Sequence, residues 1–170
     1  MKSTSFSTST LRALFFCTLS ILLMAIPGKA AEGEKRRDAQ ATITFADSLF
    51  QSGALYRATM EYERFLYFYP THPDIPRARF NLATAAKRAG DYPFALECYS
   101  SLAKKYQGTS TAIKASFEEA EVLYLMRNYQ SAHNHYAAFL ARYPEHPLAE
   151  EATRGLAKIE QLGAGTSDKN

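Results

Sequence analysis

In this 170-residue sequence, the positions of the histidines and cysteines show whether a metal site or a reactive thiol can be expected. His133 and His135 are the only two histidines that lie close together. Residues two apart on a helix point to different faces, so this pair is poorly placed to share one metal ion. His72 and His146 occupy equivalent loop positions, and we interpret both as loop structure. The histidines therefore predict no metal site.

Cys98 falls on an apolar helical stripe beside Tyr99 and Leu102, where a thiol commonly acts as a small apolar filler. The sequence contains no glycine-rich phosphate loop, no nucleophile elbow and no pair of carboxylates spaced for acid–base chemistry. We therefore predict that the protein is not an enzyme and requires no cofactor.

The N-terminal residues have the order of a secretory signal peptide. Lys2 and Arg12 precede an uncharged run, residues 13–26, which is followed by small residues. Cleavage after Ala30 puts small residues at the positions that a signal peptidase reads, so we predict residues 1–30 as the signal peptide and a periplasmic mature chain. The alternative is a retained anchor, but the run is shorter than the roughly 20 residues that span a bilayer.

The excess of basic over acidic residues in the full sequence comes from this predicted signal peptide. Of 20 Lys and Arg, three lie in residues 1–30, which leaves 17 against 17 Asp and Glu in the mature chain. A near-neutral chain gives no reason to expect nucleic acid or an anionic membrane as a partner. One cysteine remains after cleavage, so packing rather than an internal disulfide must stabilise the fold.

The mature chain is organised by an internal repeat of 37 residues. Small and aromatic residues recur at this spacing without a gap. The repeated sets are Ala41, Ala78, Ala115 and Ala152; Ala46, Ala83, Ala120 and Ala157; Ala58, Ala95 and Ala132; and Tyr62, Tyr99 and Tyr136.

Each repeat contains two stretches with apolar residues three and four apart, which is the spacing of one helix face. In the second repeat they cover residues 77–89 and 92–106, and Gly90 and Asp91 between them suit a tight turn. Pro70 and Pro144 end second helices, whereas Pro76 and Pro147 stand where first helices begin.

The predicted fold is all-α, with three stacked helical hairpins and a C-terminal capping helix. The predicted boundaries are 31–40 for a charged N-terminal extension, 41–77, 78–114 and 115–151 for the hairpins, 148–162 for the cap, and 163–170 for a disordered tail.

The hairpins resemble tetratricopeptide (TPR) repeats. Two small residues twelve apart, such as Ala83 and Ala95, are followed by Tyr99, and Pro70 and Pro144 fall at the terminal proline position. The tryptophan of the TPR pattern is absent, and Thr42, Arg79 and Ser116 stand in its place. The resemblance implies a right-handed α-solenoid that mediates protein–protein interactions.

The inter-repeat sequences Tyr-Pro-Thr-His-Pro, 69–73, and Tyr-Pro-Glu-His-Pro, 143–147, make the resemblance narrower. They resemble the repeats of the periplasmic cell-division coordinator beside the Tol–Pal system and of BamD, the lipoprotein of outer-membrane assembly. The similarity covers residues 41 to about 160. It implies a cell-envelope partner and a scaffold function, with an accessory binder of peptidoglycan or of an envelope enzyme as the alternative.

The resemblance also implies a peptide-binding groove lined by the first helix of each hairpin. Register places there Ile43, Asp47, Phe50, Phe80, Asn81, Thr84, Lys87, Phe117, Glu121, Tyr124 and Lys158. Ile43, Phe80 and Phe117 are equally consistent with the core. Phe50 and Tyr124 are the better candidate anchors. Of the residues with which some TPR proteins clamp a terminal carboxylate, only Asn81 and Lys114 have counterparts here.

Overall fold

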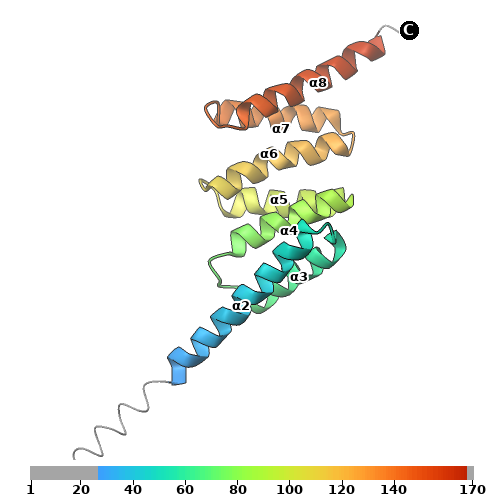
Figure 1. Cartoon of the computed structure of the whole chain (residues 1–170). Helices are drawn as coiled ribbons and strands as arrows, with labels where there is room; N and C mark the ends of the chain where they lie inside the picture. Colours follow the sequence, from blue (N-terminus) through green and yellow to red (C-terminus); the bar gives the residue numbers. More distant parts are fainter. Residues whose placement is uncertain (1–26, 168–170) are drawn as a thin grey trace, which may run out of the picture. The chain divides into compact units, whose positions relative to one another are not determined.

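A computed structural model describes residues 27–167, and every regular element in this range is an α-helix (Figure 1). The helices are α2 (Pro27–Gln51), α3 (Leu55–Phe68), α4 (Ile75–Ala89), α5 (Tyr92–Lys105), α6 (Ser110–Leu125), α7 (Tyr129–Arg142) and α8 (Ala149–Ser167). Residues 1–26 of the predicted signal peptide lie outside the described residues. Of the described helices, none is long and apolar enough to cross a membrane.

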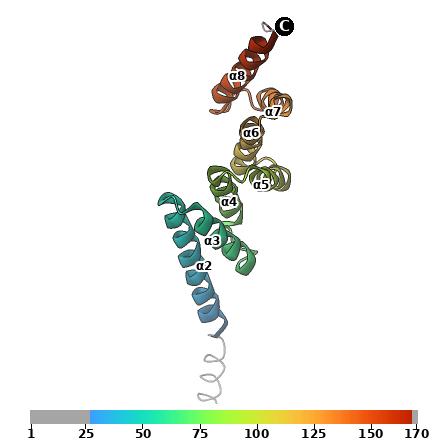
Figure 2. The same cartoon turned by 90° about the vertical axis from the view of Figure 1, so that its right-hand side faces the viewer.

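The chain divides into two units between Ala41 and Thr42, and the repeats belong to the second unit. Each helix from α3 to α8 packs against the next, and α4 also contacts α6. Figure 2 shows α4, α6 and α8 on one side of the stack and α5 and α7 on the other. The predicted all-α repeat solenoid is therefore confirmed.

The interior of each hairpin is a large tyrosine surrounded by small residues. Tyr62, Tyr99 and Tyr136 are at most 1% exposed. The alanines at the two small positions of each hairpin are completely buried: Ala46, Ala58, Ala83, Ala95, Ala120 and Ala132. Alanine lets the helix backbones approach closely, and the aromatic ring fills the space on one side of the crossing. The 37-residue register places all nine residues as observed.

The turn inside each hairpin also repeats. Gly53, Gly90 and Arg127 are one period apart and have positive φ values of 80°, 87° and 60°. The residue after each donates its backbone N–H to a carbonyl five residues earlier: Ala54 to Leu49, Asp91 to Ala86, and Asn128 to Leu123. This is the left-handed helix ending for which glycine is the usual residue.

Replacing Arg127 with glycine should therefore stabilise the protein by about 1 kcal/mol, because a left-handed backbone costs an L-residue roughly 1–2 kcal/mol and glycine loses part of that gain as chain entropy. Urea denaturation of the variant measures the difference. The reciprocal change, Gly90→Arg, should lower the unfolding free energy by a similar amount. An unchanged midpoint for both variants would contradict this account of the turn.

The residue that begins the second helix is a capping residue in two hairpins. The Asp91 carboxylate accepts a hydrogen bond from the Phe94 N–H at 3.2 Å, and the Asn128 side chain accepts one from Ser131 at 3.3 Å. Ala54, one period earlier, has no side-chain cap. The N-terminus of α3 is thus less well satisfied than those of α5 and α7.

Replacing Ala54 with aspartate should supply the missing cap and raise the unfolding free energy by about 1 kcal/mol. The opposite change, Asp91→Ala, should cost about the same. Thermal denaturation of both variants tests the symmetry of the two positions. A destabilised Ala54→Asp protein would show that the first turn of α3 differs from that of α5.

Two of the three turns that follow a second helix, those before α4 and α8, are built around a histidine. His72 Nδ1 accepts a hydrogen bond from the Asp74 N–H at 3.2 Å, and its ring packs edge-on against Phe65. His146 Nδ1 accepts from the Leu148 N–H at 3.1 Å, and its ring packs edge-on against Phe139. The interpretation of these two histidines as loop structure is confirmed.

The charged N-terminal extension, residues 31–40, is helical and continues α2. The ends of α4, α5 and α8 differ from the predicted ones, since α4 begins at Ile75 rather than Arg77 and α5 ends at Lys105 rather than Tyr106. Pro76 lies in the first turn of α4 as predicted, but Pro147 lies in a turn before α8, which begins at Ala149 rather than Leu148. α8 continues to Ser167, so residues 163–167 are helical rather than part of a disordered tail.

Candidate functional site

The side of the stack formed by α4, α6 and α8, here called the groove face, carries most of the residues predicted to line a groove. The tyrosine of each hairpin reaches this side through its hydroxyl. Tyr62 donates to Asp47 at 2.6 Å and Tyr136 to Glu121 at 2.5 Å, whereas Tyr99 and Thr84 share a hydrogen bond of 2.8 Å. Asp47, Thr84 and Glu121 are one period apart, so the same core-to-surface bond recurs in every hairpin.

These bonds explain how a polar hydroxyl can lie at the end of a buried ring. Burial raises the pKa of Tyr62 above its usual value, and the hydrogen bond to Asp47 raises it further. The pKa of Tyr136 is raised in the same way, by burial and then by Glu121. Both hydroxyls therefore stay protonated and act as permanent donors.

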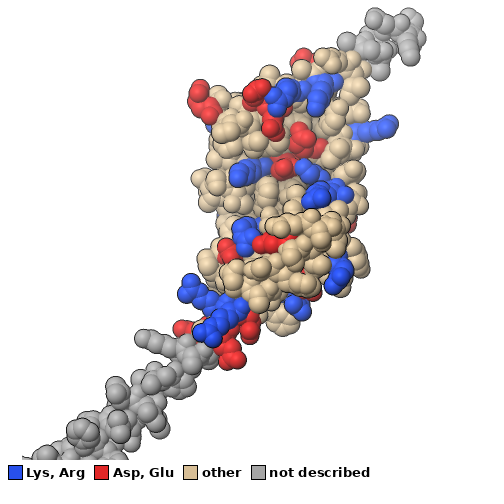
Figure 3. Space-filling model, in the orientation of Figure 1, with Lys and Arg blue, Asp and Glu red and all other residues tan. Residues whose placement is uncertain are grey.

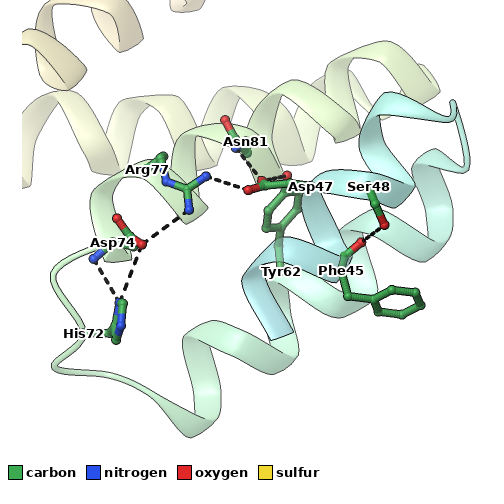
Figure 4. A network of polar contacts seen from close by, with 8 residues as sticks. All are labelled: Phe45, Asp47, Ser48, Tyr62, His72, Asp74, Arg77 and Asn81. Carbon is green, nitrogen blue, oxygen red and sulfur yellow. Dashed lines mark hydrogen bonds and ion pairs between the residues drawn. The ribbon is translucent and has the colours of Figure 1, made fainter. Parts of the chain in front are cut away.

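Asp47 is the centre of a polar network in the first hairpin (Figure 4). Besides Tyr62, it accepts hydrogen bonds from Arg77 at 2.7 Å and from Asn81 at 3.1 Å. Arg77 also pairs with Asp74 at 3.4 Å. Burial alone would raise the pKa of Asp47, but the hydrogen bonds from Tyr62 and Arg77 outweigh it, and the pKa is lowered. Asp47 and Asn81 thus join two hairpins and are already occupied.

A cavity of about 310 Å³ lies farther along the groove face, among α4, α6, α7 and α8. Five of the predicted groove residues line it, namely Lys87, Phe117, Glu121, Tyr124 and Lys158. The other lining residues are Glu118, Tyr136, Glu151, Arg154 and Gly155. The sequence prediction and the cavity therefore overlap on α4, α6 and α8.

The cavity wall contains three cations and three carboxylates. Lys87 pairs with Glu118, and Arg154 lies 3.8 Å from Glu151. Within residues 32–162, Lys158 has no ion-pair partner. Acidic and basic side chains are interspersed over the face shown in Figure 3, without a large area of one sign. Such a surface suits a ligand that offers both charges rather than a polyanion.

The remaining predicted residues lie away from the cavity. Phe50 is half-buried, with the Arg88 guanidinium carbon 4.8 Å from its ring centre. Phe80 packs edge-on against Tyr99, with ring centres 5.5 Å apart. Ile43 is completely buried, so of its two predicted placements, groove and core, the core is the observed one. Phe117 is 5% exposed and packs against Phe139 and Tyr136 while it also touches the cavity.

One buried carboxylate was missed by the sequence prediction. Glu119 on α6 is 8% exposed, and its Oε2 lies 3.3 Å from Nδ1 of His135. Burial raises its pKa, and the nearby His135 opposes this. One period away on either side stand Leu82 and Leu156. The repeat pattern could have indicated this residue, because a charged residue stands where the neighbouring repeats have leucine.

Cys98 and the histidine pair of α7 carry no sign of reactive chemistry. Burial raises the pKa of the Cys98 thiol to about 11, and Glu97 adds to the effect, so the thiol stays protonated. His135 faces Glu119, whereas Nδ1 of His133 is buried without a hydrogen-bond partner. Across the described part of the chain, no group of three His, Cys, Asp or Glu side chains could hold a metal ion.

The stacked hairpins, their paired alanines and the buried tyrosines define the TPR fold. The TPR domain of P58(IPK) superimposes with a TM-score of 0.63 at 19% identity over 82% of this chain and 37% of that one. No protein-family model and no curated protein sequence matches the chain.

Two further structures with this fold contain a bound peptide. The Yersinia enterocolitica type III secretion chaperone SycD, in complex with a peptide of the translocator YopD, has a TM-score of 0.62 at 17% identity, over 73% of this chain and 93% of that one. The second TPR domain of human RPAP3, in complex with an HSP70 peptide, has a TM-score of 0.59 at 17% identity, over 74% and 98%. At these identities the likeness concerns the fold.

Proposed function

We propose that the protein is a scaffold that binds a segment of another protein on its groove face, with the cavity of the third hairpin and capping helix as the main contact. The proposal rests on this cavity, because its wall contains both an aromatic side chain, Tyr124, and the cation of Lys158. An aromatic ring beside charges of both signs is typical of a peptide-binding surface. The peptides bound to SycD and the RPAP3 domain support the same kind of ligand.

We further propose that this scaffold acts in the bacterial cell envelope, beside an outer-membrane assembly or Tol–Pal component. The order of residues 1–30 supports export, and the Tyr-Pro-x-His-Pro turns support the envelope subfamily. N-terminal sequencing of protein recovered from the periplasm tests the first part, with Ala31 as the expected first residue. Recovery from the cytoplasm with Met1 retained would overturn it.

Affinity capture from a cell-envelope fraction tests the binding proposal. The bait is the protein purified from cells that produce the full chain, compared with a variant carrying Tyr124→Ala and Lys158→Ala. The matched control is Lys105→Ala on α5, which lies on the other side of the stack. We expect a specific protein that is captured by wild type and control and lost with the double variant.

A separate Phe50→Ala bait determines how far the groove extends. Loss of the captured protein with this variant would place the first hairpin in the binding site, and its retention would confine binding to the cavity. Capture that survives the Tyr124 and Lys158 changes would move the site to another face. If no protein is captured and the chain sediments with purified sacculi, the alternative of peptidoglycan binding replaces the proposal.

A further inference from the structure

The outward face of α3 carries four large apolar side chains that the fold does not bury. Tyr56 is 76% exposed, Met60 54%, Tyr67 79% and Phe68 58%. The first three lie along one stripe of the helix, since positions four and eleven apart share a face. Tyr67 and Phe68 contact each other edge-to-face, with ring centres 5.1 Å apart. Contiguous exposed aromatic groups of this kind mark interaction surfaces.

The repeat itself shows that the fold does not require these residues. The positions one and two periods later on α5 and α7 are also exposed, but they hold side chains that are ordinary on a solvated face. The counterparts are Pro93, Glu97, Lys104 and Lys105 on α5 and Gln130, Asn134, Ala141 and Arg142 on α7. The apolar stripe is therefore specific to the first hairpin.

A surface cavity of about 310 Å³ adjoins the N-terminal half of this stripe. α3 contributes Tyr56, Thr59, Met60 and Glu63 to it, and the opposite wall consists of Ala86, Ala89, Asp91 and Phe94. The exposed pair Tyr67 and Phe68 lies at the other end of the same helix. A recess and a protruding aromatic pair thus share one face, separated by two to three helical turns.

This arrangement is self-complementary. A two-fold axis through the middle of the stripe, between Glu63 and Arg64, would pair α3 with an antiparallel copy of itself and would bring each Tyr67–Phe68 pair to the recess of the other copy. The same axis would set Glu63 opposite Arg64 of the second copy, so that two ion pairs would form across the contact. Both side chains are exposed, and Arg64 is 52% exposed while it pairs with Glu61. Isologous contacts need this match of each patch to itself.

We propose that the outer face of α3 is a homodimer interface in which the two α3 helices pack antiparallel about this axis. Each aromatic side chain can bury roughly 150–250 Å², so the stripe and its rim supply on the order of 1,000 Å² in total, which is at the lower end for specific interfaces. The dimer is therefore a weak to moderate one. It leaves the cavity among α4, α6, α7 and α8 open in both copies, so the assembly is bivalent.

Sedimentation velocity over a range of protein concentrations tests this proposal, with protein purified from cells that produce the full chain. We expect wild type to shift from monomer to dimer as concentration rises. The variant Met60→Glu with Tyr67→Glu, which sets like charges opposite each other because the axis pairs position 60 with position 67 of the second copy, should stay monomeric or dimerise at least roughly tenfold more weakly. The matched control Glu97→Ala with Lys104→Ala on α5 should dimerise as wild type does.

A charge exchange tests the position of the axis without removing the aromatic groups. Glu63→Arg alone and Arg64→Glu alone should each weaken the dimer, because like charges then face each other, and the double exchange should restore it. Circular dichroism of each variant checks that the helices remain folded. The proposal is overturned if wild type stays monomeric at every concentration, or if the dimer is indifferent to all α3 changes. It is also overturned if a monomeric wild type cosediments with phosphatidylethanolamine and phosphatidylglycerol vesicles, which would assign the stripe to a lipid surface.

Discussion

Replacing Gly155 with alanine should destabilise the protein by about 1–3 kcal/mol, although alanine is the better helix former. A Cβ at this position of α8 would lie 2.6 Å from Cζ of Tyr136, well inside contact distance. The Tyr136 ring is 1% exposed and its hydroxyl is bonded to Glu121, so it cannot move aside. Overpacking therefore outweighs the gain in helix propensity of up to about 1 kcal/mol.

The matched control for Gly155→Ala is Gly33→Ala on α2, where an added Cβ meets nothing within 4 Å. Helix propensity acts alone there, so stability should rise slightly or stay unchanged. Urea denaturation monitored by circular dichroism compares the two variants with wild type. A Gly155→Ala protein as stable as wild type would mean that α8 can shift away from α7 at little cost.

Replacing Glu119 with leucine should stabilise the protein at neutral pH by about 1–4 kcal/mol, because a carboxylate buried away from water is often less favourable than apolar packing of similar volume. Leucine already occupies the equivalent positions 82 and 156, where Leu82 is 5% exposed. The groups facing Glu119 are Ser100 and Lys104 on α5 and His135 on α7. Removing the carboxylate leaves these three on partly exposed helices, where water can solvate them.

The pH dependence of the Glu119→Leu effect has a definite sign. Because the folded pKa of Glu119 is raised above the usual 4.5, folding favours its protonated form. Its contribution to stability is therefore fully present below pH 4.5 and is lost as pH rises through the folded pKa. The advantage of the leucine variant should thus grow from acid to neutral pH. Glu160→Leu on the exposed side of α8 is the control, and an equal gain there, or a gain independent of pH, would contradict the prediction.

The repeat register predicted the fold because it reports on positions that every hairpin must satisfy in the same way. Tyr99 must fill the space beside Ala83 and Ala95, so these residue types recur and can be read from one sequence. The predicted helix boundaries were less accurate. The boundaries depend on small local differences in free energy between helix and coil. Beyond Leu162, for example, small residues can either fray or extend a helix, and α8 continues to Ser167.

Five of the residues predicted to line a groove also line the cavity, but the sequence could not show which of the predicted residues are already bonded to other side chains. Asp47 is bonded to Tyr62, Arg77 and Asn81, and this depends on side chains from three helices meeting in space. Lys87 and Glu118 pair across 31 residues of sequence for the same reason. Periodicity predicts which residues lie on the same helix face. The ion-pair or hydrogen-bond partner of a charged side chain depends instead on rotamers and on the packing between repeats.

Packing of each helix mainly on its neighbours along the stack, from α3 to α8, has a consequence for the order in which the molecule opens. Helices at the end of such an array can detach while the middle stays folded. Amide hydrogen exchange should therefore be slowest in α5 and α6 and faster in α8. Because α8 forms one wall of the cavity, a brief detachment of this helix would widen the cavity from the side and would give any ligand bound there a second route of release.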